Sequence, residues 1–319
     1  MWNKIENVLK DSKKRKPYVV AVLLSVLFVW EIFWFSPFLS TYLGIVGVIL
    51  HEMVLAGIGV GVFVVFHGKM KIIFPFKDLR GDYAIGTILM WIGAYQIMMA
   101  LSYFMSIFFP EEIAQASSSV NSLVDMLPVS VGLFVVALVP AVCEEIAFRG
   151  ALLSCFRHIK NRWIGIVIVA LLFGACHGSI WRMLPTAILG AFMGYILFET
   201  ENMFYNMLFH FINNAFPVIL LGITRMLTPF AGIESEMNGL ISSEGYTRMM
   251  TEAFAGAVKM AAIAPLLICV GNYMLHRGTE AYANGLFSEA KRDVLVKAFI
   301  VSVTLWGTGT AMQFILYFI

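Results

Sequence analysis

Charged residues are scarce in this sequence of 319 residues. Asp, Glu, Lys and Arg together make up 13% of it, whereas soluble domains average about a quarter. This scarcity excludes an ordinary soluble domain. Hydrophobic residues account for 60% of the chain, and the mean hydropathy is +0.84. The composition therefore predicts an all-α fold, namely a polytopic bundle of membrane-spanning helices.

Cysteine is also rare, and the HExxH zinc motif is missing. The four cysteines all lie in apolar segments, which indicates neither a disulfide framework nor a metal knuckle. His51-Glu52 has no second histidine at the zinc-motif spacing, so we interpret it as a structural pair. The net charge of +2 is spread over loops and does not indicate a nucleic-acid partner. The lipid bilayer is the expected environment.

A cleaved signal peptide is not expected. Residues 1–17 are polar and basic. The apolar run from Tyr18 to about Phe35 is too long for a signal-peptide core and is not followed by a small-residue cleavage site. We therefore predict a basic cytoplasmic segment over 1–17 and a single transmembrane domain over 18–319.

Hydropathy predicts nine spans, with boundaries uncertain by a few residues. They are about 18–36, 42–66, 83–109, 129–155, 163–177, 184–199, 203–222, 253–275 and 297–318. With the N-terminus inside, the inner segments hold 17 Lys and Arg residues and the outer loops hold three. Because Lys and Arg accumulate on the cytoplasmic side, this asymmetry predicts a cytoplasmic N-terminus and an external C-terminus.

The fourth span contains three charges that are costly inside a bilayer. Glu145 and Arg149 are four residues apart, so they share a helix face and can pair. Glu144 points about 100° away and has no partner on its own helix. A carboxylate in this position is by default a functional-site hypothesis.

Further polar residues occur in later spans. His177 ends span five, and His210 and Asn214 are four residues apart on span seven. At 1.5 Å per residue, Glu144 lies roughly 17 Å, His177 roughly 21 Å, His210 roughly 10 Å and Asn214 roughly 16 Å from the inner face. In a hydrocarbon core about 30 Å thick, these side chains can meet near mid-depth.

Small residues and a proline modify three of the spans. Gly57 with Gly61, and Gly190 with Gly194, have the GxxxG spacing of close helix contacts. Pro140 cannot donate a backbone hydrogen bond to Val136, which predicts a kink one turn before Glu144. The longest predicted connection is an outer loop over 223–252.

Three motifs, in order and on separate spans, resemble one family. They are Glu144-Glu145-x-x-x-Arg149, Phe173-x-x-x-His177 and His210-x-x-x-Asn214. Together they resemble the CPBP (CAAX protease and bacteriocin-processing, or Abi) family of intramembrane endopeptidases, which is related to the type II CAAX prenyl endopeptidase. The resemblance covers about residues 125–222, the expected catalytic core.

The resemblance implies an intramembrane protease, a hydrolase of the CAAX endopeptidase type. It implies that Glu144 and His177 activate a water molecule and that His210 and Asn214 stabilise the oxyanion. Glu145 and Arg149 complete the predicted catalytic set. The family carries the label metalloprotease, so a zinc site formed by Glu144, His177 and His210 is the alternative. We favour no metal and no other cofactor, because HExxH is missing and Arg149 lies beside the site.

Other functions stay open at this point. A non-catalytic immunity or adaptor protein and a proton-coupled transporter are the alternatives to an enzyme. The expected partner is a peptide or protein substrate. It is lipidated in the eukaryotic relatives, and bacterial members are expected to process peptide precursors or membrane-protein tails. The expected location is the plasma membrane of a prokaryote.

Overall fold

The computed structural model describes residues 17–66, 68–77, 79–116, 127–231 and 243–318. The described residues are helical and contain no strand, which confirms the predicted all-α class. The predicted basic segment falls almost wholly outside the described residues, which begin at Pro17 with helix α2.

Eight helices are long and apolar enough to cross a membrane in the described part of the chain. A ninth apolar helix, α10 (Arg162–Ala175), is shorter. These nine correspond one by one to the predicted spans, so the chain is an integral, multi-pass membrane protein. The length of α10 agrees with the short span five, since 14 residues rise only about 21 Å.

The described residues form two compact units, and each is described by itself. The first unit comprises residues 1–78 and 138–207, and the second comprises residues 79–137 and 208–319. The elements of the first unit are α2 (Pro17–Trp30), η1 (Glu31–Phe35), α3 (Ser36–Leu43), α4 (Ile45–Val65), α5 (Met70–Ile73), α9 (Val139–Glu144), η3 (Glu145–Leu152), η4 (Leu153–Phe156), α10, α11 (Ile180–Thr200) and the first residues of α12 (Met203–Ala231).

In the first unit, the segment that follows α5 is tied to the start of α12. Lys77 Nζ lies 2.5 Å from Glu201 Oε2. Asn202 Nδ2 donates to the carbonyl oxygen of Lys77 at 2.6 Å, and the backbone N–H of Met203 donates to the carbonyl oxygen of Pro75 at 2.8 Å. The contacts place both segments on the same side of the first unit; that this is the inner side stays a prediction.

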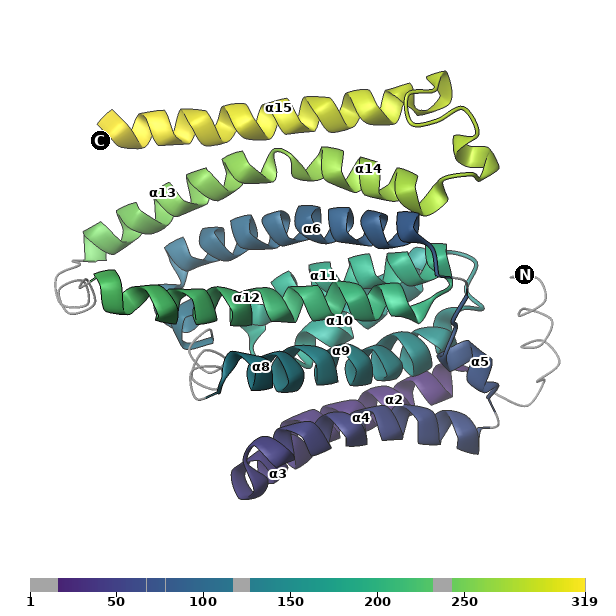
Figure 1. Cartoon of the computed structure of the whole chain (residues 1–319). Helices are drawn as coiled ribbons and strands as arrows, with labels where there is room; N and C mark the ends of the chain where they lie inside the picture. Colours follow the sequence, from purple (N-terminus) through teal and green to yellow (C-terminus); the bar gives the residue numbers. More distant parts are fainter. Residues whose placement is uncertain (1–16, 67, 78, 117–126, 232–242, 319) are drawn as a thin grey trace. The chain divides into compact units, whose positions relative to one another are not determined.

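The second unit contains the remaining described helices, long and short (Figure 1). They are α6 (Gly81–Phe108), α8 (Val129–Gly132), η2 (Leu133–Leu138), most of α12, α13 (Ser243–Ala261), α14 (Ala264–His276), η6 (Glu280–Tyr282) and α15 (Glu289–Phe318). Within this unit α15 runs alongside α13 and α14, and α6 packs against the other side of the same two helices.

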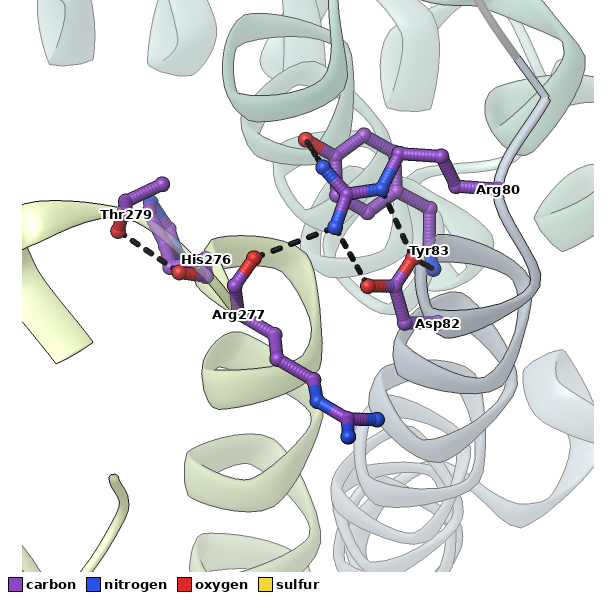
Figure 2. A network of polar contacts seen from close by, with 6 residues as sticks. All are labelled: Arg80, Asp82, Tyr83, His276, Arg277 and Thr279. Carbon is purple, nitrogen blue, oxygen red and sulfur yellow. Dashed lines mark hydrogen bonds and ion pairs between the residues drawn. The ribbon is translucent and has the colours of Figure 1, made fainter. Parts of the chain in front are cut away.

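A polar network joins the first residues of α6 to the end of α14 (Figure 2). Arg80 Nε and Nη2 donate to the two carboxylate oxygens of Asp82 at 3.0 and 2.6 Å. Arg80 Nη2 also donates to the carbonyl oxygen of Arg277 at 3.2 Å. The bidentate pair fixes the guanidinium plane, which therefore holds two predicted inner ends of the second unit together.

The segment Val129–Phe156 departs repeatedly from α-helical geometry. It contains a π-helical stretch over Leu133–Leu138 and another over Glu145–Leu152, and it ends in the 3₁₀ turn η4. The first stretch lies just before Pro140, where the missing N–H interrupts the α-helical ladder. Such π-turns are frequent at functional sites, and here the second one begins at Glu145.

Two sequence predictions need correction. Gly57 and Gly61 have no neighbour within 4 Å of the position that a Cβ would occupy, whereas a Cβ at Gly59 would lie 3.2 Å from Ala147 Cα. The close contact of α4 therefore uses the opposite helix face, because glycine spacing cannot indicate which face meets protein. The connection is also shorter than 223–252, because α12 continues through residues 223–231 to Ala231 and α13 already begins at Ser243, within a polar stretch.

Candidate active site

Glu145 and Arg149 form a fully buried ion pair in the first unit. Both side chains are 0% exposed, and Arg149 Nη1 donates to Glu145 Oε1 at 2.9 Å. Arg149 Nη2 donates to the carbonyl oxygen of Gly190 at 3.3 Å. The guanidinium carbon lies 4.1 Å from the centroid of the Phe173 ring, a favourable cation–π geometry. The predicted pairing is confirmed, and it connects η3 to α10 and α11.

Two residues of other helices complete the surroundings of this pair. Asn206 Nδ2 donates to the carbonyl oxygen of Met193 at 2.6 Å and lies 3.5 Å from Glu145 Oε2. A Cβ at Gly190 would lie 3.2 Å from Arg149 Nη2, tighter than ordinary van der Waals contact. A side chain at position 190 would require the guanidinium to shift by a few tenths of an ångström. Asn206 is a contributor that the sequence analysis missed.

The side chain of Glu144 has a neighbour that the sequence does not indicate. Glu144 is the last residue of α9, and the carboxyl group of Glu52 on α4 lies close enough to interact with it electrostatically. The sequence could have indicated Glu52 in the same way as Glu144, because both are ionisable residues within an apolar span.

Two further ionisable side chains of the first unit lie next to Glu52. The ring of His51 has Nε2 at 3.6 Å from Glu52 Oε1 and Nδ1 at 3.6 Å from Glu31 Oε1. Glu31 is 0% exposed and begins the π-helical turn η1. The sequence prediction of a structural His51-Glu52 pair is therefore incomplete, because the imidazole lies between two carboxyl groups.

His177 lies at the turn between α10 and α11. Its Nδ1 is 2.8 Å from the carbonyl oxygen of Phe173, which can only accept, so Nδ1 carries the hydrogen and Nε2 is the acceptor of the neutral ring. Gly178 follows with φ +71°, a backbone conformation that glycine adopts without strain. Cys176 lies within electrostatic range of Glu144, which places His177 and Glu144 in the same region of the first unit.

His210 and Asn214 belong to the second unit, on α12. His210 is 3% exposed. Asn214 Nδ2 donates to the carbonyl oxygen of Val136 at 3.2 Å, and Asn213 Nδ2 donates to Asn214 Oδ1 at 3.2 Å. Val136 is the residue whose carbonyl cannot receive a hydrogen bond from Pro140. The side chain of Asn214 therefore donates to the carbonyl oxygen of Val136, which cannot receive a hydrogen bond from Pro140. Together with the hydrogen bond from Asn213, this contact fixes the amide plane of Asn214.

No metal sphere can be assembled from the described side chains. In the part of the chain that the structure describes, no three His, Cys, Asp or Glu residues are grouped so that they could hold an ion. The four cysteines are free thiols. The metal-free mechanism stays a prediction.

The fold and these side chains define a class: a polytopic helical membrane protein with a buried ion pair and a carboxyl pair within its apolar spans. Residues 127–216 match the family model described as Type II CAAX prenyl endopeptidase Rce1-like. The match confirms the resemblance to the CPBP family, and it suggests a protease. Neither the comparison with curated proteins nor that with solved structures found a match.

Proposed function

We propose that this protein is an intramembrane endopeptidase that hydrolyses a peptide bond of a membrane-associated protein or peptide. The observation that carries the proposal is the position of the family match. Residues 127–216 contain all three motifs in order, and with them the six predicted catalytic residues Glu144, Glu145, Arg149, His177, His210 and Asn214.

In the proposed reaction, Glu144 and His177 activate water. The water oxygen attacks the peptide carbonyl carbon while its proton passes to the base, and the carbonyl oxygen becomes an oxyanion. His210 and Asn214 donate hydrogen bonds to that oxyanion. The C–N bond then breaks, and the proton held by the base passes to the leaving amine. Protons and electrons balance without a cofactor.

The local geometry of two residues supports these roles. The hydrogen bond from His177 Nδ1 to the Phe173 carbonyl leaves Nε2 as the ring atom that accepts a proton. One amide hydrogen of Asn214 is used by Val136, and an amide nitrogen carries two. The fixed amide plane suits a preorganised donor, since catalytic donors gain from needing no reorganisation.

Glu145 and Arg149 have a different role in this proposal. They are fully buried and interact with each other, with the carbonyl oxygen of Gly190 and with Asn206, while Arg149 Nε has no hydrogen-bond partner among the described residues. We assign them to holding the π-helical segment that follows Glu144 against α10 and α11. They therefore position the catalytic carboxyl without taking part in proton transfer.

The proposed setting is the plasma membrane of a prokaryote, with the N-terminus in the cytoplasm. The support is the excess of Lys and Arg in the predicted inner segments. The substrate is a peptide precursor, a membrane-protein tail or a lipidated protein. Each presents a peptide bond at membrane depth.

Comparison of three cell populations tests the function. Cells that produce the Glu144→Gln variant are expected to accumulate an uncleaved membrane protein or peptide that cells with the wild-type chain process. Quantitative mass spectrometry of new N- and C-termini measures this. Glu199→Gln is the matched control, because Glu199 pairs with Arg162 on the first unit and plays no part in the proposed site. Identical termini in all three populations would contradict the proposal.

A chelator distinguishes the metal-free mechanism from the zinc alternative. Turnover by the purified enzyme is expected to survive long treatment with phenanthroline, and elemental analysis is expected to find no stoichiometric metal. The physical reason is that asparagine is a good amide donor but a poor zinc ligand. A zinc protease treated in parallel shows that the chelator works in the same detergent.

The opposite outcome is equally specific. If phenanthroline abolishes turnover, zinc restores it and one metal is bound per chain, then the metal-free mechanism is wrong. In that case Glu144, His177 and His210 are the ligands to examine first.

A further inference from the structure

A chain of ionisable side chains leads from the first span to the proposed catalytic carboxyl. Glu31, His51, Glu52 and Glu144 follow one another in space, although they come from three separate segments of the first unit. The family match begins at residue 127, so three of these four lie outside it. Neither the motifs nor the match therefore assigns them a role.

The carboxyl groups of Glu31 and Glu52 are unusually deeply buried. Glu31 is 0% and Glu52 is 4% exposed. Neither oxygen of Glu31 has a hydrogen-bond partner among the described residues, although His51 Nδ1 lies 3.6 Å away. Buried carboxyl groups without compensating hydrogen bonds are costly. A cost of this kind persists at functional sites, where it holds a reacting group in place.

We propose that Glu52 is a positioning residue that fixes the carboxyl group of Glu144, and that His51 and Glu31 in turn hold Glu52. This inference rests on the proposed function, because it assigns Glu144 as the base. A carboxyl on a side chain with three rotatable bonds needs an anchor to face a water molecule in one orientation. Glu52 supplies that anchor from α4.

The fold supports this assignment at both ends. Glu144 lies at the junction between α9 and the π-helical segment η3, so its backbone is set by a break in the helical ladder. Glu52 lies on the same helix as Gly59, whose close approach to Ala147 packs α4 against η3. The contact of α4 with the catalytic segment is therefore a packed one, and the anchor is rigid.

Three substitutions at position 52 separate positioning from other roles. Glu52→Leu removes the carboxyl group next to Glu144, and kcat is expected to fall about 10²-fold with little change in KM, the typical cost of a misplaced catalytic group. Glu52→Gln keeps an amide donor for the Glu144 carboxylate, and kcat is expected to stay within about tenfold of wild type. Glu52→Asp is too short to reach and should behave like Glu52→Leu.

Glu31, which is separated from Glu144 by His51 and Glu52, gives a graded control. Glu31→Gln is expected to lower kcat less than Glu52→Leu, because it acts through His51 and Glu52. Glu199→Gln, a change of the same chemistry at the Arg162 pair, is expected to leave kcat unchanged. Thermal unfolding of every variant in the same detergent separates loss of fold from loss of orientation.

The outcomes distinguish this inference from the proposed function. If wild type cleaves no substrate, the proposed function fails. If wild type cleaves and Glu144→Gln does not, while Glu52→Leu keeps wild-type kcat, only the positioning role of Glu52 is wrong. An equal loss of kcat in Glu52→Gln and Glu52→Leu also contradicts the positioning role, because an amide donor at position 52 would then not hold the Glu144 carboxylate. If Glu52→Leu does not insert, the comparison of Glu52→Gln with Glu52→Asp decides.

Discussion

Glu144→Gln is expected to abolish cleavage while the protein still inserts and folds. Gln has nearly the same volume, but its amide cannot accept the proton of the attacking water. A general base typically contributes about 10²–10⁴ in rate, so turnover should fall by that factor or below detection. The measurement is the initial rate on the substrate that the mass-spectrometric comparison identifies.

Two controls accompany this experiment. Glu199→Gln applies the same chemical change to a carboxyl that pairs with Arg162, and it should cleave at the wild-type rate. Asn214→Ala should be slow, because one oxyanion donor contributes about 10²–10³ in rate. Full activity of Glu144→Gln would remove the proposed base and with it the mechanism.

Arg149→Met is expected to destabilise the protein by about 3–5 kcal/mol, because it leaves Glu145 buried beside no cation. Both side chains of the pair are 0% exposed, so water cannot replace the lost partner. Reversible unfolding in mild detergent measures the change. The double variant Glu145→Gln/Arg149→Met removes both charges together and should recover more than half of the loss.

A second arginine offers a matched control with the same spacing. Arg248 Nε lies 3.1 Å from Glu252 Oε1, also four residues apart on one helix, but the two side chains are 54% and 53% exposed. Exposed pairs contribute about 0–1 kcal/mol, so Arg248→Met should change stability little. Equal losses at Arg149 and Arg248 would show that burial of the first pair has no energetic consequence.

The same substitution separates the two roles assigned to the acidic pair. Arg149→Met leaves Glu144 chemically intact, so any folded fraction should retain some turnover. Glu144→Gln should show the reverse, normal stability with no turnover. Two carboxyl groups that are adjacent in sequence thus have different expected consequences, because one is satisfied within the fold and the other faces Glu52.

Contacts along a single helix could be predicted from the sequence. The apolar runs determine the nine membrane helices, because a span needs a fixed length of hydrocarbon-compatible residues. The spacing of four residues determines the Glu145–Arg149 pair, since residues four apart lie near one face both in an α-helix and in the π-helical turn found here. The order of the three motifs determines the family resemblance.

Only the tertiary structure decided which helix faces meet. Glu52 lies beside Glu144, Gly59 makes the contact predicted for Gly57 and Gly61, and Asn214 caps the carbonyl of Val136. The rotation and axial offset of neighbouring helices set these contacts. In a membrane protein the lipid-facing and the buried side chains are both apolar, so the hydrophobic pattern of a helix cannot indicate which face is packed.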